Sequence, residues 1–154
     1  MECHFCNCIV DSVGSQSDPS PTLYHCPVCG DVKITREAAE NFESEGFTEN
    51  QKSILSIVLR NEYERRNKKP PETSDTLDDL RRYVRQYRPL SSLEKLDYSL
   101  FNFEKATEFI GHNVAVNPEY DYPCYHCVDP IELKHILAFL LNNRFISPFQ
   151  GHDR

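Results

Sequence analysis

The sequence lacks the features that define membrane, secreted and most enzymatic proteins. No apolar run in its 154 residues approaches the roughly 18 residues that a bilayer-spanning helix needs. The first residues do not show the basic-then-apolar pattern of a secretion signal, so we expect a cytoplasmic protein with reduced cysteines. We find no nucleophile–base motif, glycine-rich phosphate loop or spaced pair of carboxylates. The sequence therefore does not argue for an enzyme.

An excess of positive charge is also absent, because the formal net charge is −7. Affinity for nucleic acid comes largely from neutralising phosphates, so an acidic chain is a poor general binder. The charge is uneven: residues 1–47 carry −6, residues 48–89 carry +3 and residues 90–154 carry −4. Only the middle third can offer a basic face. The 39% of hydrophobic and 27% of charged residues are typical of a globular chain.

Two Cys-x2-Cys knuckles are the most specific motif. The first contains Cys3 and Cys6, and the second contains Cys26 and Cys29, nineteen residues further on. This spacing is typical of a zinc ribbon, in which four thiolates bind one structural Zn²⁺ and metal binding supplies much of the folding free energy. Four thiolates leave no open position for a substrate. Two alternatives are that Cys8 replaces Cys6, and that one knuckle is only a turn with buried thiols.

A third Cys-x2-Cys contains Cys124 and Cys127. It could be half of a second metal site or a redox dithiol. However, no further cysteine pair is left to complete a metal site, and the next helix is expected to begin only at Pro130, later than a redox motif requires. We favour the interpretation that these two thiols pack in an aromatic loop.

A basic segment in the middle of the chain could contact nucleic acid, with interleaved tyrosines that stack on bases. Its candidate contact residues are Arg60, Arg65, Arg66, Lys68, Lys69, Arg81, Arg82 and Arg85. The alternative, which we favour, is a solvated helical face balanced by nearby acidic side chains.

Capping and stop signals predict a mainly α chain with a small amount of β structure. Helices are expected over residues 35–42, 48–69, 74–87, 91–110 and 129–142, and short strands over 32–34, 113–117 and 144–146. In the fourth helix, the expected buried side consists of Leu93, Leu96, Leu100 and Phe103. The predicted division is a zinc ribbon with a short helix over residues 1–47 and a helical domain over 48–154.

The segment from Ser91 onward resembles a winged-helix domain. A helix over Leu93–Ile110 is followed by the leucine-rich stretch Glu132–Leu140 and then by Arg144-Phe145-Ile146, which resembles the passage from a recognition helix into a wing. The resemblance implies a further wing strand, but the sequence given stops at Arg154. We therefore expect an N-terminal portion of a longer protein with a truncated wing; the alternative is a short natural wing.

The whole arrangement also resembles a bacterial N-terminal module. In that module a ribbon with the pattern Cys-Pro-x-Cys-Gly-x-Tyr/Val-x-Ile-Thr precedes helices, a Leu-Glu-Lys-x-Asp helix and a winged-helix-like end. The matching pieces here are Cys26–Thr35 and Leu93–Asp97. Such modules often precede effector domains of predicted antiphage or stress-response proteins. The resemblance implies a sensing or interaction part.

The sequence thus predicts a non-enzymatic recognition or regulatory module, stabilised by one Zn²⁺, that binds a protein or regulates an attached effector. The alternative is a nucleic-acid-binding regulator that uses the basic segment and the winged helix. A third hypothesis, an enzyme that uses Cys124 and Cys127 or an open zinc, requires an activity that disappears when those residues are changed.

Overall fold

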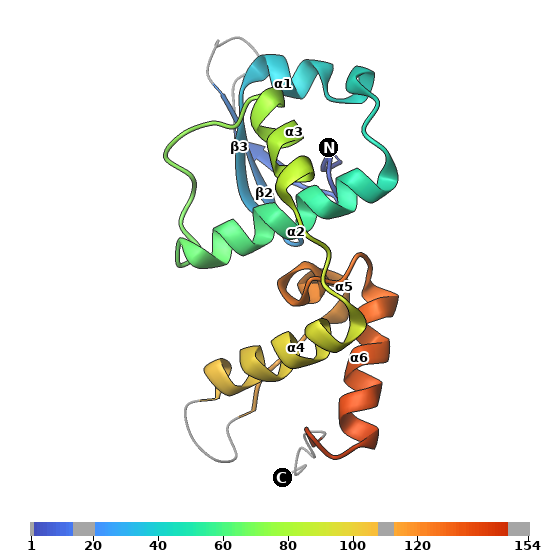
Figure 1. The fold of residues 1–154 in the computed structure, drawn as a ribbon. Helices are drawn as coiled ribbons and strands as arrows, with labels where there is room; N and C mark the ends of the chain where they lie inside the picture. The colour runs from blue at the N-terminus through green and yellow to red at the C-terminus, as the bar shows by residue number, and fades with distance from the viewer. Residues whose placement is uncertain (1, 14–20, 108–112, 148–154) are drawn as a thin grey trace. The chain divides into compact units, whose positions relative to one another are not determined.

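The computed structural model describes residues 2–13, 21–107 and 113–147. It divides the chain into two compact units, Met1–Arg88 and Pro89–Arg154 (Figure 1). The sequence-based division lies at residue 47 instead, before the third and fourth helical elements of the first unit. Tertiary packing explains the difference, because the third element packs onto the strand that follows the second knuckle and the fourth packs onto the third.

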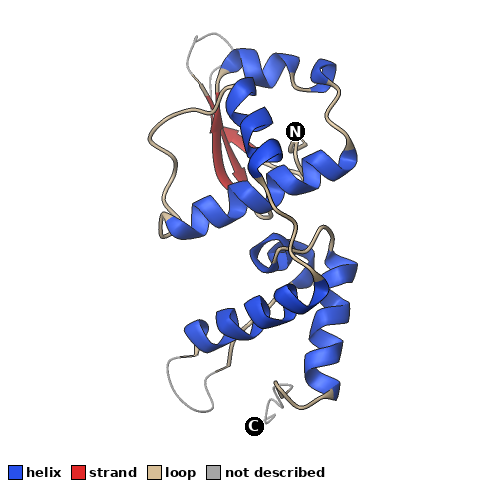
Figure 2. Ribbon diagram, viewed as in Figure 1, coloured by secondary structure: helices blue, strands red, loops and turns tan. Residues whose placement is uncertain are grey.

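A small antiparallel sheet lies in the first unit (Figure 2). Its strands are β1 (Asp11–Val13), β2 (Thr22–Cys26) and β3 (Gly30–Ile34), in the order β1-β2-β3. Tyr24 of β2 lies opposite Val32 of β3, and both are buried. Side chains of β3 alternate between buried and half-buried, as expected for a strand with one face on the core.

The three α-helices of the first unit begin at side-chain caps, and a 3-10 helix follows the first of them. They are α1 (Arg36–Asn41), the 3-10 helix η1 (Glu43–Glu45), α2 (Glu49–Arg65) and α3 (Leu77–Gln86). The predicted cap at Thr35 and the predicted capping box of Thr48 with Gln51 are confirmed. The third predicted helix begins later than expected, because Thr76 caps α3 in a capping box with Asp79.

The core of the first unit lies between β3 and helices α2 and α3. Its fully buried large side chains include Val32, Ile34, Phe42, Leu55 and Leu80. One edge of β3 is bound to the segment before α3. The amide of Thr35 donates to the carbonyl of Asp75 at 2.9 Å, and the amide of Asp75 donates to the carbonyl of Lys33 at 2.9 Å. These bonds fix α3 against the sheet.

The second unit is helical over its described residues. Its elements are α4 (Ser92–Ala106), α5 (Pro118–Asp121), the 3-10 helix η2 (Tyr122–Tyr125) and α6 (Pro130–Asn142). The capping box of Ser91 with Glu94 and the Asp129 cap of α6 are confirmed as predicted. The predicted end of the fourth helix at Ile110 falls outside the described residues, and α4 ends at Ala106.

Both strands predicted for this unit are wrong. Asn113–Asn117 is an irregular segment, in which the Asn117 side chain caps α5. Arg144–Ile146 forms a turn at the end of α6 because Arg144 adopts a left-handed φ of 61°. The amides of Arg144 and Phe145 then donate back to the carbonyls of Leu141 and Leu140, at 3.1 and 2.9 Å. This C-terminal turn takes the backbone groups that a strand would use.

The buried side of α4 also differs from the predicted one. Leu93 is 68% exposed, whereas Lys95 and Ser99 are buried. The Lys95 ammonium group pairs with Glu132 of α6 at 2.6 Å, and the Ser99 hydroxyl donates to the Lys95 carbonyl at 2.7 Å. Polar partners therefore compensate for burial at positions that an apolar stripe does not reveal.

No helix within the described residues has both the length and the apolar character required to cross a bilayer.

Candidate metal centre

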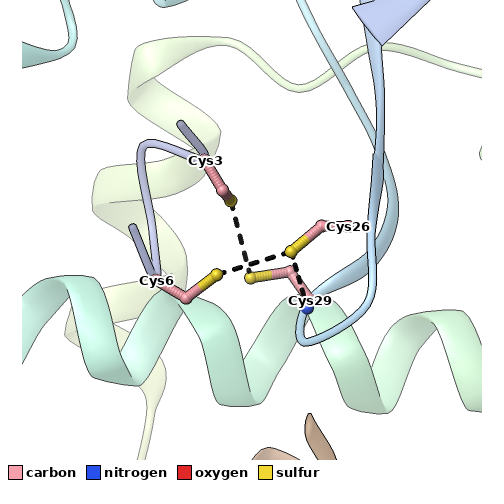
Figure 3. Close-up of side chains that lie close together, drawn as sticks. All are labelled: Cys3, Cys6, Cys26 and Cys29. Atoms are coloured by element: carbon pink, nitrogen blue, oxygen red, sulfur yellow. Dashed lines mark hydrogen bonds between the residues drawn. The ribbon is translucent and has the colours of Figure 1, made fainter. Parts of the chain in front are cut away.

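Four cysteine side chains from two distant segments meet in the first unit (Figure 3). The sulfurs of Cys3, Cys6, Cys26 and Cys29 all lie within 4.8 Å of one another. The Sγ atoms of Cys3 and Cys29 are 3.9 Å apart, and those of Cys6 and Cys26 are 3.4 Å apart. A tetrahedron of sulfurs around Zn²⁺ has edges of about 3.8 Å. The four side chains therefore fit one tetrahedral metal ion.

Each pair of sulfurs comes from a tight turn. Cys26 ends β2 and Cys29 directly precedes β3, so the β2–β3 hairpin places both at its tip, where the amide of Cys29 donates to Cys26 Sγ at 3.3 Å. In the first knuckle, the amide of Cys3 donates to the carbonyl of Cys8 at 2.8 Å. Cys8 does not belong to the four-sulfur group. The structure thus selects Cys6 over Cys8 as the fourth candidate ligand.

The electrostatics of the cluster suit a cation. Hydrogen bonds from the thiols of Cys29, Cys3 and Cys6 lower the pKa of Cys26. Burial, followed by hydrogen bonding with the other three sulfurs, raises the pKa of Cys29. One thiolate can therefore form at the expense of its neighbours. A bound Zn²⁺ would stabilise all four thiolates together, which makes metal binding depend on release of their protons.

Two buried polar residues of helix α2 form hydrogen bonds with the two knuckles. The Cys29 thiol lies 3.4 Å from the hydroxyl of Ser56, which donates to the carbonyl of Phe5 at 3.1 Å. The guanidinium group of Arg60 donates to the carbonyls of Pro27 and Val28, at 2.7 and 3.2 Å. Ser56 thus links the second knuckle to the first, and Arg60 holds the turn of the second. Sequence reasoning missed Ser56, because a serine within a helix carries no motif.

Gly30 follows the last cysteine with a left-handed φ of 79°. A Cβ atom at this position would overlap the ring of Tyr63, which is on α2. Glycine is needed here for both the backbone conformation and the close approach of the helix. The histidines near the knuckles have other partners: His4 contacts the Tyr24 hydroxyl at 3.2 Å, and His25 pairs with Asp31 at 2.8 Å.

The third cysteine pair lies in the second unit, around the end of η2. Cys124 is half-buried in η2, and Cys127 is fully buried. Within the described residues, only the four-sulfur cluster brings together three or more candidate metal ligands, so this pair is not part of such a group. Burial raises the pKa of Cys127 to about 12. Tyr122 and Tyr125 of η2 are buried as well, and the favoured interpretation, two thiols that pack in an aromatic loop, stays a prediction.

We expect Cys127 to resist alkylation in the folded protein. A pKa of about 12 keeps its thiol protonated at pH 8, and the thiolate is the nucleophile. Treatment with iodoacetamide at pH 8, followed by peptide mass spectrometry, should leave Cys127 unmodified in the native chain and modified in the denatured chain. Rapid native modification would contradict the burial and support a reactive dithiol.

Most of the basic candidates for nucleic-acid contact have acidic neighbours. Their ion pairs are Arg65–Glu62 at 2.6 Å, Lys68–Glu64 at 3.9 Å, Arg81–Asp78 at 3.0 Å and Arg82–Asp79 at 2.6 Å. Arg81 also pairs with Glu45. Arg60 is buried beneath the second knuckle, and Arg85 is exposed on α3. Arg66 and Lys69 line a pocket beside β3.

Comparison with protein-family models, with curated proteins and with solved structures finds no match to this chain. The chain is mainly helical, with a small antiparallel sheet and a four-cysteine candidate metal centre in its first unit.

Proposed function

We propose that this chain is a zinc-stabilised recognition module that binds a protein partner or regulates an attached effector. In this proposal the four cysteines form a zinc ribbon that holds the first unit together. The second unit provides the contact surface for the partner. The observation that carries the proposal is the exposure of large apolar side chains on α4 and α6.

Helix α6 presents apolar residues on more than one side. Leu133 and Leu140 are fully buried, whereas Ile131 is 61% and Phe139 is 47% exposed. An ordinary surface helix confines its apolar residues to one face. Ile131 and Phe139 lie about two turns apart on the same side of the helix. An additional apolar face of this kind is typical of a helix that packs against a partner.

Helix α4 and the chain after α6 add to this exposed apolar area. Leu93 is 68% exposed, Phe101 is 48% exposed and Phe145 is 59% exposed. Protein interfaces are enriched in aromatic side chains at their centres, and these two phenylalanines supply such groups. We call Leu93, Phe101, Ile131, Phe139 and Phe145 the apolar surface of the second unit.

The biological setting of the proposal rests on the sequence resemblance. The zinc-ribbon pattern and the winged-helix-like order of helices resemble the bacterial N-terminal modules described above. We accordingly propose that the attached partner is an effector domain of an antiphage defence protein. The second unit would then act as the interaction part of that module.

The alternative, a nucleic-acid-binding regulator, is less well supported. Ion pairs neutralise five of its eight basic candidates, and one of these, Arg60, is also buried against backbone carbonyls. The chain is also acidic overall, with a net charge of −7. Specific observations in its favour are confined to the remaining basic residues near the C-terminal end of α2 and on α3.

Affinity capture from the source organism tests the proposal. We expect the native chain to retain a specific protein that the double variant Ile131→Asp, Phe139→Asp loses. The exposed pair Lys134→Gln, Glu119→Gln, in the same unit, is the matched control and should retain it. Equal capture by the native chain and the aspartate variant would contradict the proposal. Binding to duplex or single-stranded nucleic acid that weakens steeply with salt would favour the alternative.

A further inference from the structure

We propose that the first unit contains a binding pocket for a small organic anion. The pocket lies beside β3, between the C-terminal end of α2, the segment of residues 69–75 and Tyr83 of α3. Its volume of about 530 Å³ falls within the range of small-molecule sites. The inference is independent of the apolar surface proposed for protein binding, which belongs to the second unit.

A left-handed turn after α2 connects the two parts of the chain that line the pocket, the helix up to Arg66 and the segment from Lys69. Asn67 and Lys68 have φ values of 54° and 60°, an uncommon conformation for residues other than glycine. The amide of Lys68 donates to the carbonyl of Tyr63 at 3.0 Å, which closes the helix end. The chain then runs through Lys69 and two prolines to Asp75, which is bonded to the edge of β3. The segment thus lies beside that edge, and residues 69–73 and Asp75 line the pocket.

Arg66 and Lys69 form the cationic end of the pocket. The guanidinium group of Arg66 donates from Nε to the Lys69 carbonyl at 3.2 Å, and from Nη2 to the Asp31 carbonyl at 3.4 Å. These two bonds fix the group and leave its other N–H donors available. Among the described residues, no carboxylate lies within ion-pair distance of Arg66 or Lys69. Neither cation therefore forms an ion pair, although the charge of Arg66 opposes the rise in the pKa of Asp75 in the same pocket.

Three of the four acidic residues that line the pocket form hydrogen bonds or ion pairs with side chains other than Arg66 and Lys69. These pairs are Glu62 with Arg65 at 2.6 Å, Asp31 with His25 at 2.8 Å and Asp75 with the Tyr83 hydroxyl at 2.8 Å. Burial raises the pKa of Asp75, and the hydrogen bond from Tyr83 and the charges of Arg66 and Arg82 oppose that rise. Glu72 is exposed at the rim. The unpaired positive charge is therefore located at the Arg66 end.

The other walls are apolar. They consist of Val32 and Leu59, both buried in the core, and of Pro70 and Pro71, with the ring of Tyr83 on the α3 side. A ligand that fits this combination has a phosphate or carboxylate head for Arg66 and Lys69 and a small apolar or aromatic body. A planar guanidinium group binds both head groups through paired hydrogen bonds.

Titration of the zinc-loaded chain, followed by amide NMR spectra, tests the inference. The probes are phenyl phosphate, benzoate and the neutral benzyl alcohol. We expect at least one of the two anions to shift the amides of Asp31 and Lys33, and the alcohol to leave them unchanged. Which anion binds more tightly identifies the preferred head group. Arg66→Gln and Lys69→Gln should each weaken binding by about tenfold, the loss expected for one charge-assisted hydrogen bond.

Arg36→Gln is the matched control, because Arg36 is an exposed arginine of α1 in the same unit and pairs only with the exposed Glu40 among the described residues. This variant should bind the anion as the native chain does. Zinc content and spectral dispersion show whether Arg66→Gln is folded. If it is not folded, the affinity of Lys69→Gln tests the inference, because Lys69 is exposed. Absence of shifts with both anions at millimolar concentration, or binding by both pocket variants as tight as that of the native chain, would overturn the inference.

Discussion

Removal of zinc is expected to unfold the first unit. The four sulfurs come from residues that are far apart in sequence, so the metal would join the first knuckle to the β2–β3 hairpin. Apparent zinc-binding free energies of about 10–16 kcal/mol in small four-ligand sites exceed the usual stability of a domain. We therefore expect a strong chelator to abolish the NMR dispersion of the sheet and the cooperative unfolding of this unit. A metal count on the untreated protein should give one zinc per chain.

Single serine variants identify the ligands. We expect Cys6→Ser to lose zinc, or to bind it far more weakly, because this side chain is one of the four gathered sulfurs. Cys8→Ser is the matched control only two residues away and should retain a full equivalent. The reverse result would show that Cys8 is the ligand. Two zinc ions per chain would support Cys124 and Cys127 as ligands of a second site, and a fold that survives chelation would refute the structural role of the metal.

Gly30→Ala is expected to destabilise the first unit by about 2–4 kcal/mol. The left-handed backbone contributes roughly 1–2 kcal/mol of this loss, because an L-residue strains in that region. The remainder comes from overlap of the new methyl group with the ring of Tyr63, which forces α2 away from the second knuckle. The measurement is denaturant unfolding of the zinc-loaded chain, with the metal concentration held fixed.

Gly46→Ala separates the two contributions. Gly46 has a similar φ of 71°, but nothing lies within 4 Å of the position that its Cβ would take. We expect this variant to lose only the backbone share, about 1 kcal/mol. Tyr63→Ala in the Gly30→Ala background should recover the part that arises from the overlap. Equal losses in the two glycine variants would show that the contact with Tyr63 carries no cost.

Local sequence signals predicted the parts of the fold that short-range chemistry decides. The capping boxes at Thr48 and Ser91 and the cap at Asp129 are formed as expected, because each depends on residues three positions apart. The four-cysteine group is found where the two knuckle spacings place it, since each knuckle fixes two sulfurs in one turn. These features need no knowledge of distant contacts.

Other predictions failed because competing long-range or local bonds had no signature in the sequence. The strand expected at Arg144–Ile146 is a turn because its amides return to α6. Leu93 is exposed because α4 turns Lys95 and Ser99 inward, where Glu132 of another helix neutralises the lysine. A stripe of leucines shows which side of a helix is apolar. It does not show that a residue of another helix, here Glu132, allows a polar side to be buried.

The sequence by itself determined the cysteine cluster, the main helix starts and the mixed charge of the middle segment. Only the tertiary structure decided which basic residues are available. It buries Arg60 beneath the second knuckle, and it leaves Arg66 and Lys69 without a carboxylate within ion-pair distance among the described residues. The physical reason is that charge depends on composition, whereas its availability depends on the distance between side chains that the fold brings together.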